Sequence, residues 1–401
     1  MKKYVVIGAS VAGISAVEVL RQQDKDGEII LISENTEIYS KPLMHYYLAG
    51  ERPRNMMSFV DQDFMEANKV TWRKGKKSVG VDTDNREVLL SDGTIVRYDR
   101  LLIATGSYPV IPEIEGVKGA ENVCTFHSLD DCRKVMEISD KAREIVVLGA
   151  GLVGVDVALG LLSKNKKVTI IDAKKHMLAM QLDAKAAKVY EEEFAKRGAA
   201  QYYNVSIAKA EQNADGEIKQ VVLTDGTKLP CDLLIMAVGA KANISWLQGS
   251  KIKTDECGLV VDEYCRTNCA DVYGAGDVTG RNLIWPAAAK EGRTAAFNMT
   301  GAGCKMTDFF EKKATINIFN IPTMSYGLTD TPDDTYKVEV KESKDNSYRK
   351  LIYKDGKIYG AILMNDMYYT GILNQLKYKN IDVSKIDKPL LDIDYADLLT
   401  F

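Results

Sequence analysis

Residues 5–16 read VVIGASVAGISA, and residues 146–157 read VVLGAGLVGVDV. In each copy, small residues at fixed offsets follow a β-branched apolar run and precede an alanine- and valine-rich stretch without proline. This pattern predicts a strand, a tight turn and the start of a helix. Such a turn lets backbone N–H groups and the positive end of the helix dipole face a pyrophosphate. The chain therefore carries two candidate nucleotide cradles.

The two cradles differ at one fingerprint position, where the first copy has serine instead of glycine. A glycine triplet alone is weak evidence, because surface turns also collect glycine. The strand after each copy strengthens the evidence for nucleotide binding, because each carries a carboxylate at its end: EIILISE ends on Glu34, and KVTIIDA contains Asp172 at its tip. A dinucleotide fold receives the ribose hydroxyls at this place. The fingerprint residues are Gly8, Ser10 and Gly13 in the first copy and Gly149, Gly151 and Gly154 in the second.

The similarity between the copies continues beyond the motif. Residues 88–106, VLLSDGTIVRYDRLLIATG, return as residues 221–239, VVLTDGTKLPCDLLIMAVG. Each has an apolar strand, an Asp-Gly hairpin turn, a return strand and a buried strand. This long internal repeat predicts two dinucleotide-binding domains and two nucleotides.

Composition excludes several other classes of function. The 401-residue chain is 46% apolar and 27% charged, which suits a globular protein of about two to three domains. A formal net charge of −3 gives no electrostatic argument for nucleic acid or an anionic membrane as partner. No apolar run reaches membrane length, and Gly8 interrupts the strand after Lys2 and Lys3, so we expect a cytoplasmic protein without a signal peptide.

The seven cysteines are an odd number without framework spacing, which also favours a reducing compartment. Four of them would be candidates for a metal or cluster site, yet no pair has Cys-x-x-Cys spacing. We therefore expect no bound metal, and packed small residues at two of them. The four are Cys257, Cys265, Cys269 and Cys304, and the two are Cys265 and Cys269.

A third motif, TNCADVYGAGD at 267–277, ends in a Gly-Ala-Gly-Asp turn. Together with the N-terminal fingerprint and ATG at 104–106, it resembles the FAD/NAD(P)-dependent pyridine nucleotide-disulfide oxidoreductase superfamily, which includes glutathione reductase, NADH oxidase and rubredoxin reductase. The resemblance implies a glutathione reductase-like α/β fold with two Rossmann-like domains, the second inserted in the first. It implies an FAD domain at 1–112 and 240–304, an NAD(P)H domain at 113–239, and a small α+β C-terminal domain at 305–401.

The resemblance also assigns roles to residues. The first fingerprint would cradle the FAD pyrophosphate, Glu34 would hold the adenosine ribose, and Asp277 would bond the ribityl chain. The second fingerprint would cradle NAD(P)H. A helix starting near WPAAAKEG, 285–292, would point at the flavin, where its dipole stabilises negative charge by up to about 2 kcal/mol, and Pro286 suits its first turn. The other expected cofactor-binding residues are Lys41, Pro42, Thr105, Gly106, Gly239, Gly276 and Ala287.

The nucleotide preference depends on Asp172, because a carboxylate there repels the additional phosphate of NADPH. We therefore expect NADH, with NADPH the less favoured nucleotide. Lys174, Lys175 and His176 follow at once and could tolerate a phosphate; the alternative is a solvated basic turn.

The electron acceptor depends on residues 39–50, YSKPLMHYYLAG. In the superfamily this region lies beside the flavin and carries a redox cysteine in disulfide reductases, NADH oxidases and peroxidases. Here no cysteine precedes Cys124. The stretch instead resembles the rubredoxin and ferredoxin reductase branch, with His45 where that branch often has lysine. That lysine pairs with a carboxylate at the position of Asp156, so His45 and Asp156 are expected near the flavin N5 edge; for His45, a packing role is the alternative.

Residues 305–401 contain strand-like runs at 315–322 and 357–365 and a helical stretch, MYYTGILNQLKYKN. We expect a small mixed sheet with helices that mediates dimerisation or partner docking. The acidic end, DIDYADLLTF at 392–401, is interpreted as a solvated terminus.

These features predict an FAD-dependent oxidoreductase that moves electrons between NADH and a rubredoxin, a ferredoxin or an iron–sulfur subunit, in either direction. We expect a homodimer or a component of a hetero-complex. One alternative is an NADH oxidase that reduces oxygen or peroxide at the flavin. Another is an interaction protein whose conformation is switched by NADH.

Overall fold

Each of the two repeated motifs lies in its own five-stranded sheet. The structure, a computed structural model, describes residues 1–306, 313–343 and 347–399. These residues divide into two units. Unit 1 holds residues 1–111, 125–137 and 239–306, and unit 2 holds residues 112–124, 138–238 and the described residues from 313 on. The two repeats therefore belong to different units.

The central sheet of unit 1 has the strand order β18-β7-β1-β2-β3, and every pairing in it is parallel. The chain leaves this sheet after β7 and returns to it with β18, as the predicted insertion requires. Strands β1, β2 and β7 are buried almost throughout, as expected for apolar runs in a parallel sheet. The strands are β1 (Lys3–Ile7), β2 (Glu28–Ser33), β3 (Val70–Lys74), β7 (Arg100–Ile103) and β18 (Val272–Gly274).

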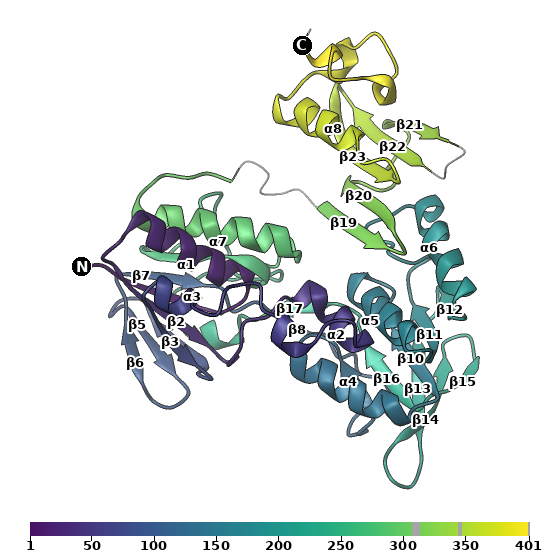
Figure 1. Cartoon of the computed structure of the whole chain (residues 1–401), viewed down its shortest axis with the longest axis horizontal. Helices are drawn as coiled ribbons and strands as arrows, with labels where there is room; N and C mark the ends of the chain where they lie inside the picture. The colour runs from purple at the N-terminus through teal and green to yellow at the C-terminus, as the bar shows by residue number, and fades with distance from the viewer. Residues whose placement is uncertain (307–312, 344–346, 400–401) are drawn as a thin grey trace. The chain divides into compact units, whose positions relative to one another are not determined.

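Two helices, α1 (Val11–Gln23) and α7 (Trp285–Thr300), lie side by side over this sheet (Figure 1). A Cβ atom on Gly292 would lie 2.0 Å from the carbonyl oxygen of Ala12, so the two backbones are in direct contact. Helix α7 begins where the sequence predicts it, with Pro286 in its first turn.

Unit 1 also contains smaller elements. They are α2 (Met44–Ala49), α3 (Phe64–Ala67), β4 (Ser78–Asp82), β5 (Glu87–Leu90), β6 (Ile95–Arg97), β8 (Ser107–Pro109), β17 (Ala240–Ala242), and the 3-10 helices η1 (Lys41–Leu43), η2 (Arg54–Met56), η3 (Ser245–Leu247) and η4 (Gly276–Thr279).

The second sheet, in unit 2, has the order β12-β11-β10-β16-β9, and a three-stranded sheet β13-β14-β15 accompanies it. Helix α4 has residues in both units. The elements are β9 (Val123–Thr125), α4 (Leu129–Lys141), β10 (Glu144–Leu148), α5 (Leu152–Ser163), β11 (Lys167–Asp172), α6 (Ala184–Lys196), β12 (Ala200–Tyr203), β13 (Ile207–Gln212), β14 (Ile218–Leu223), β15 (Lys228–Pro230) and β16 (Leu233–Met236).

The internal repeat extends to the hairpins. Strands β5, β6 and β7 of unit 1 follow one another as β14, β15 and β16 do in unit 2. Both predicted Asp-Gly turns are present, with φ of +82° at Gly93 and +88° at Gly226. Only glycine adopts such values at little cost, so these two residues allow the hairpins to close.

The C-terminal part of unit 2 is a five-stranded antiparallel sheet of order β19-β20-β23-β22-β21, with α8 (Tyr369–Tyr378) packed on it. The prediction of a mixed sheet is wrong, because two-residue turns such as Phe319-Asn320 and Asp355-Gly356, all with positive φ, connect antiparallel neighbours. Among the described helices, none is long and apolar enough to cross a membrane. The strands are β19 (Lys313–Ile318), β20 (Ile321–Gly327), β21 (Lys337–Glu342), β22 (Tyr348–Lys354) and β23 (Lys357–Met364).

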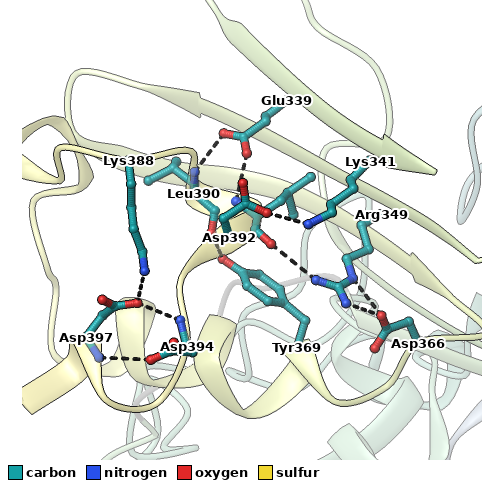
Figure 2. A network of polar contacts seen from close by, with 11 residues as sticks. Glu339, Lys341, Arg349, Asp366, Tyr369, Lys388, Leu390, Asp392, Asp394 and Asp397 are labelled. Carbon is teal, nitrogen blue, oxygen red and sulfur yellow. Dashed lines mark hydrogen bonds and ion pairs between the residues drawn. The ribbon is translucent and has the colours of Figure 1, made fainter. Parts of the chain in front are cut away.

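The acidic C-terminal stretch is bound to this sheet, as Figure 2 shows. The carboxylate of Glu339 accepts the backbone N–H groups of Leu390 and Leu391 at 2.9 and 2.8 Å. Asp392 pairs with Lys341. The interpretation of residues 392–401 as a solvated terminus is therefore wrong at Ile393 and Leu398, which are buried, whereas residues 394–396 are exposed and 400–401 lie outside the described residues. Two apolar side chains of this stretch, Ile393 and Leu398, are buried against α8 and the sheet, together with Leu391 just before it.

Three 3-10 helices complete this region: η5 (Val383–Lys385), η6 (Leu390–Asp392) and η7 (Asp397–Leu399).

Candidate nucleotide-binding sites

The first cradle lies between β1 and α1 in unit 1. Gly8 has φ of +116°, and a Cβ there would lie 2.0 Å from the Ala104 carbonyl oxygen. A Cβ on Gly13 would lie 1.8 Å from the Gly8 carbonyl oxygen. Ser10 is the N-cap of α1, but its side chain makes no capping hydrogen bond. The close approaches require glycine at both positions, and they leave the helix N-terminus to face an anion.

The Gly-Ala-Gly-Asp turn of the same unit is held by a buried carboxylate. The Oε2 of Glu291, in α7, accepts the backbone N–H of Gly276 at 2.7 Å. Burial raises the pKa of Glu291 to about 7. The next residue, Asp277, accepts a hydrogen bond from the Ser107 hydroxyl at 2.9 Å. The turn that carries Asp277 is thus fixed from two sides, and Glu291 is a residue that sequence reasoning missed.

A second missed residue is His127, which contacts the predicted site residue Lys41. The Lys41 Nζ lies 2.9 Å from the His127 Nε2. Burial and the Lys41 charge lower the pKa of His127 to about 4, although a hydrogen bond with the Ser107 backbone opposes this. Burial also lowers the pKa of Lys41, while Asp277 raises it. A neutral His127 therefore accepts from Lys41 beside the Asp277 carboxylate.

The remaining residues predicted to contact FAD are distributed over unit 1. The Thr105 hydroxyl donates to the Asn243 carbonyl oxygen at 3.1 Å. Gly106, with φ of +69°, has no heavy atom within 4 Å of a built Cβ. Glu34 is exposed after β2 and pairs with Lys77 at 3.3 Å. Pro42 and Ala287 lie in the first turns of η1 and α7. A glycine-walled cradle, a helix N-terminus and a fixed Asp277 together fit the pyrophosphate and ribityl chain of FAD.

The second cradle, in unit 2, repeats the geometry of the first. A Cβ on Gly149 would lie 2.3 Å from the Ala237 carbonyl oxygen, and one on Gly154 would lie 1.9 Å from the Gly149 carbonyl oxygen. Gly151 is the N-cap of α5 and has no heavy atom within 4 Å of a built Cβ. The backbone therefore leaves no room for a side chain at Gly149 and Gly154, whereas the space beside Gly151 is open, as pyrophosphate binding requires.

Asp172 lies at the end of β11, beside this cradle. Its Oδ2 accepts the Ala150 N–H at 2.5 Å, and its Oδ1 accepts the Lys174 N–H at 2.7 Å. The carboxylate thus joins the glycine loop to the next turn. The interpretation of residues 174–176 as a solvated basic turn is wrong at His176, which is buried with its Nδ1 3.0 Å from the Met177 carbonyl oxygen. Lys174 and Lys175 are exposed.

The predicted catalytic pair, His45 and Asp156, is divided between the two units. The expected approach of these two residues to the flavin N5 edge therefore stays a prediction. His45 lies in α2 of unit 1, where burial lowers its pKa. Asp156 lies in α5 of unit 2, where burial raises its pKa to about 7. Gly239 has φ of +123° and belongs to unit 1, where its carbonyl oxygen accepts the Val110 N–H at 2.9 Å. Within the described residues, no group of three or more His, Cys, Asp or Glu is placed to hold a metal.

Comparison with known proteins identifies the family of the chain. Residues 2–292 match the pyridine nucleotide-disulphide oxidoreductase family. The chain belongs to this family. Residues 314–380 match the rubredoxin NAD+ reductase C-terminal domain. The protein is an NAD(P)H-dependent FAD oxidoreductase of the rubredoxin and ferredoxin reductase branch, as predicted.

Individual relatives support this placement. The chain is 29% identical to the NADH-dependent phenylglyoxylate dehydrogenase subunit epsilon of Aromatoleum evansii, over 96% of this chain and 93% of that protein. It is 27% identical to the assimilatory nitrate reductase electron transfer subunit of Bacillus subtilis, over 98% of this chain but 51% of that protein. It is 27% identical to the rubredoxin-NAD(+) reductase of Pseudomonas putida, over 70% of this chain and 73% of that protein. The chain thus spans about half the length of the nitrate reductase subunit.

Solved structures show the same fold. A ferredoxin reductase from Rhodopseudomonas palustris has a TM-score of 0.86 at 21% identity, covering 100% of this chain and 99% of its own. The NADH:rubredoxin oxidoreductase of Clostridium acetobutylicum has a TM-score of 0.76 at 20% identity, with coverage of 100% and 99%. The predicted glutathione reductase-like α/β fold with two Rossmann-like sheets and a C-terminal domain is confirmed.

Proposed function

We propose that this oxidoreductase transfers electrons between NADH and a small redox protein or iron–sulfur subunit. The observation that carries the proposal is the absence of a thiol from the segment expected beside the flavin: Tyr39–Gly50 forms η1 and α2 and contains Lys41 and His45, and the first cysteine of the chain is Cys124. A cysteine-based route to disulfides or peroxides would need a thiol there. Two relatives, named as an electron transfer subunit and a rubredoxin reductase, support the same class of acceptor, as does a third named as a subunit of an NADH-dependent dehydrogenase.

In this proposal, unit 1 holds FAD and the second cradle holds NADH. FAD, when bound, converts between a two-electron hydride donor and one-electron carriers. Lys41 would supply positive charge near it, and His127 would hold Lys41 in place. The residues assigned to FAD are Gly8, Ser10, Gly13, Glu34, Lys41, Pro42, Thr105, Gly106, Gly276, Asp277, Pro286 and Ala287, and those assigned to NADH are Gly149, Gly151, Gly154, Asp172 and Gly239.

The preference for NADH is assigned to Asp172. Two backbone N–H groups already bind its carboxylate oxygens, which fixes the carboxylate at the tip of β11. A ribose diol can donate hydrogen bonds to this carboxylate, whereas a 2′-phosphate would meet like charge. The proposal also assigns a role to each domain. Residues 1–112 and 240–304 bind FAD, residues 113–239 bind NADH, and residues 305–401 serve dimerisation or partner docking.

The test is stopped-flow reduction of the purified flavoprotein by NADH, followed by mixing with oxidised rubredoxin, with oxidised ferredoxin or with aerated buffer. We expect either carrier to reoxidise the flavin much faster than oxygen does. Faster reoxidation by oxygen would replace this proposal with the NADH oxidase. Slow reoxidation by every acceptor, together with a change of oligomeric state on adding NADH, would favour the interaction protein.

A further inference from the structure

The turn after β11 connects the proposed ribose site to the C-terminal sheet. Residues 173–183 follow Asp172, whose Oδ1 accepts the Lys174 N–H at 2.7 Å. The Lys174 carbonyl oxygen accepts the Asn204 N–H at 3.0 Å, and the Leu178 N–H donates to the Ala150 carbonyl oxygen at 2.9 Å. The turn is thus bonded to the cradle at both of its sides. Charges on its side chains would therefore act close to the proposed ribose site.

One of these charges is engaged by the C-terminal sheet. The Lys175 Nζ lies 3.1 Å from an oxygen of Asp330, in the loop after β20. The other oxygen of Asp330 lies 3.4 Å from the Lys350 Nζ. Lys350 also donates to Asp183 at 2.8 Å and to the Thr329 carbonyl oxygen at 2.7 Å. Asp330 is therefore placed between a buried cation and the cation of the nucleotide turn.

The exposure of these groups shows which of them are fixed. The side chains of Lys350 and Asp183 are 11% and 7% exposed, whereas those of Lys175 and Asp330 are 62% and 51% exposed. The net pKa of Asp330 is lowered: burial raises it, but the hydrogen bond from Lys175 and the Lys350 charge outweigh burial. Asp330 is thus ionised at neutral pH. Its contact with Lys175 is a solvent-exposed ion pair, a type of interaction that contributes only modestly to stability.

The loop that carries Asp330 is held close to the turn by further contacts with α6. The Tyr190 hydroxyl donates to the Ile321 carbonyl oxygen at 2.8 Å and lies 2.7 Å from the Thr323 hydroxyl. The rings of Phe194 and Phe319 pack edge to face, with centroids 4.9 Å apart. Strand β20 and the loop after it are therefore docked on the nucleotide-binding part of unit 2.

A positive side chain near the ribose is what accommodates a 2′-phosphate in dinucleotide folds. Lys175 is of the right charge and lies in the right turn, but Asp330 neutralises it. We propose that Asp330 is a specificity-determining residue, which favours NADH by engaging the Lys175 ammonium. Asp330 acts through Lys175 and is a positioning residue rather than a catalytic one. This inference rests on the proposed function, since it requires the nucleotide to bind at the second cradle.

The test is calorimetric titration of the FAD-loaded full chain with adenosine 5′-monophosphate and with adenosine 2′,5′-bisphosphate. The two ligands differ only in the 2′-phosphate, and their binding is read without turnover. Asp330→Asn should lower the Kd of the bisphosphate by about two- to fivefold, the range set by exposed ion pairs, and leave that of the monophosphate unchanged. The gain should shrink at high salt.

Two further variants make the test specific. Asp333→Asn removes a charge from the same loop, where Asp333 bonds Thr335 rather than a lysine, and should not change either Kd. Lys175→Gln combined with Asp330→Asn should abolish the gain. A gain that persists without Lys175, an equal gain in Asp333→Asn, or no gain in a folded Asp330→Asn protein would each overturn the inference. If neither ligand binds the unmodified chain, the proposed nucleotide site itself is misplaced.

Discussion

Lys41 and His127 are 86 positions apart in the sequence, yet the Lys41 Nζ lies 2.9 Å from the His127 Nε2. Burial lowers the pKa of both groups, so the pair is stable with a neutral histidine that accepts from the ammonium. Ser107 connects this pair to Asp277, because its backbone bonds His127 and its hydroxyl donates to Asp277. The proposed FAD site is therefore supported by one continuous polar network in unit 1.

The His127 pair predicts a pH dependence of stability. Its pKa is about 4 in the folded chain against an ordinary value of 6.5, so the unfolded chain binds a proton more readily between these values. Stability should be fully present above pH 6.5 and should fall as the pH drops towards 4. His127→Gln should flatten this part of the profile, measured as the midpoint of thermal unfolding against pH. His45→Gln, measured in parallel, separates the contribution of the other histidine with a lowered pKa; an unchanged slope in His127→Gln would contradict the assignment.

Gly13 should be intolerant of any side chain. A Cβ there would lie 1.8 Å from the Gly8 carbonyl oxygen, so Gly13→Ala should displace the turn and yield colourless protein. The measurement is the flavin absorbance of the purified variant relative to its protein content. Gly80→Ala is the matched control in unit 1, since its nearest atom would be the Leu89 Cβ at 3.8 Å, and it should stay yellow. A Gly13→Ala protein with a full content of FAD would place the flavin elsewhere.

Asp172 should control the choice between the two nucleotides. Asp172→Asn keeps an oxygen that can accept the Ala150 or Lys174 N–H but removes the charge. Loss of hydrogen bonds to a charged group costs about 1.5–3 kcal/mol, so NADH should bind roughly tenfold or more weakly. The affinity for NADPH should fall less, because the repulsion between the Asp172 carboxylate and the 2′-phosphate also disappears. Kd values for both nucleotides check this, and an unchanged ratio between them would mean that the ribose lies at another site.

The C-terminal stretch should be released by a change at Glu339. Its carboxylate accepts the Leu390 and Leu391 N–H groups at 2.9 and 2.8 Å. Glu339→Ala should cost about 1–3 kcal/mol in the local opening of this stretch, because two partly buried donors lose their acceptor. Hydrogen exchange of the two amides is the measurement. Glu342→Ala, on the same strand but exposed, should leave their exchange unchanged; equal protection in Glu339→Ala would show that apolar packing alone holds the stretch.

The repeated motifs made the two Rossmann-like sheets predictable, because a strand, a glycine turn and a helix follow from local sequence. The Asp-Gly turns were predictable for the same reason, whereas the start of α7 was implied by the family resemblance, with Pro286 suited to its first turn. His127 was not: a lone histidine gives no local signal, and its partner is distant in the sequence. The residues directly after His127 do carry a signal for the start of a helix. Ser128 and Asp131 bond each other's backbone N–H groups, as the two residues of a capping box do.

The errors in the C-terminal region have identifiable causes. The turn residues Asn320 and Gly356 were signals for antiparallel hairpins that the prediction did not use. At the chain end, the many aspartates suggested a solvated terminus, although Leu391, Ile393 and Leu398 alternate with them and are buried. Composition could not show that Lys341 pairs with Asp392, or that Glu339 accepts the backbone N–H groups of Leu390 and Leu391 just before it.

Asp183 binds three partners at once: its Oδ1 accepts the Ala186 N–H at the start of α6, and its Oδ2 accepts from Tyr348 and Lys350. One carboxylate thus caps a helix of the nucleotide-binding part and neutralises a buried lysine of the C-terminal sheet. A chimaera that exchanged residues 313–399 with those of another reductase would leave this carboxylate buried without its cation unless the new sheet supplied one. The C-terminal sheet and the start of α6 therefore form one electrostatic unit in this chain, in which a change to one part requires a compensating change in the other.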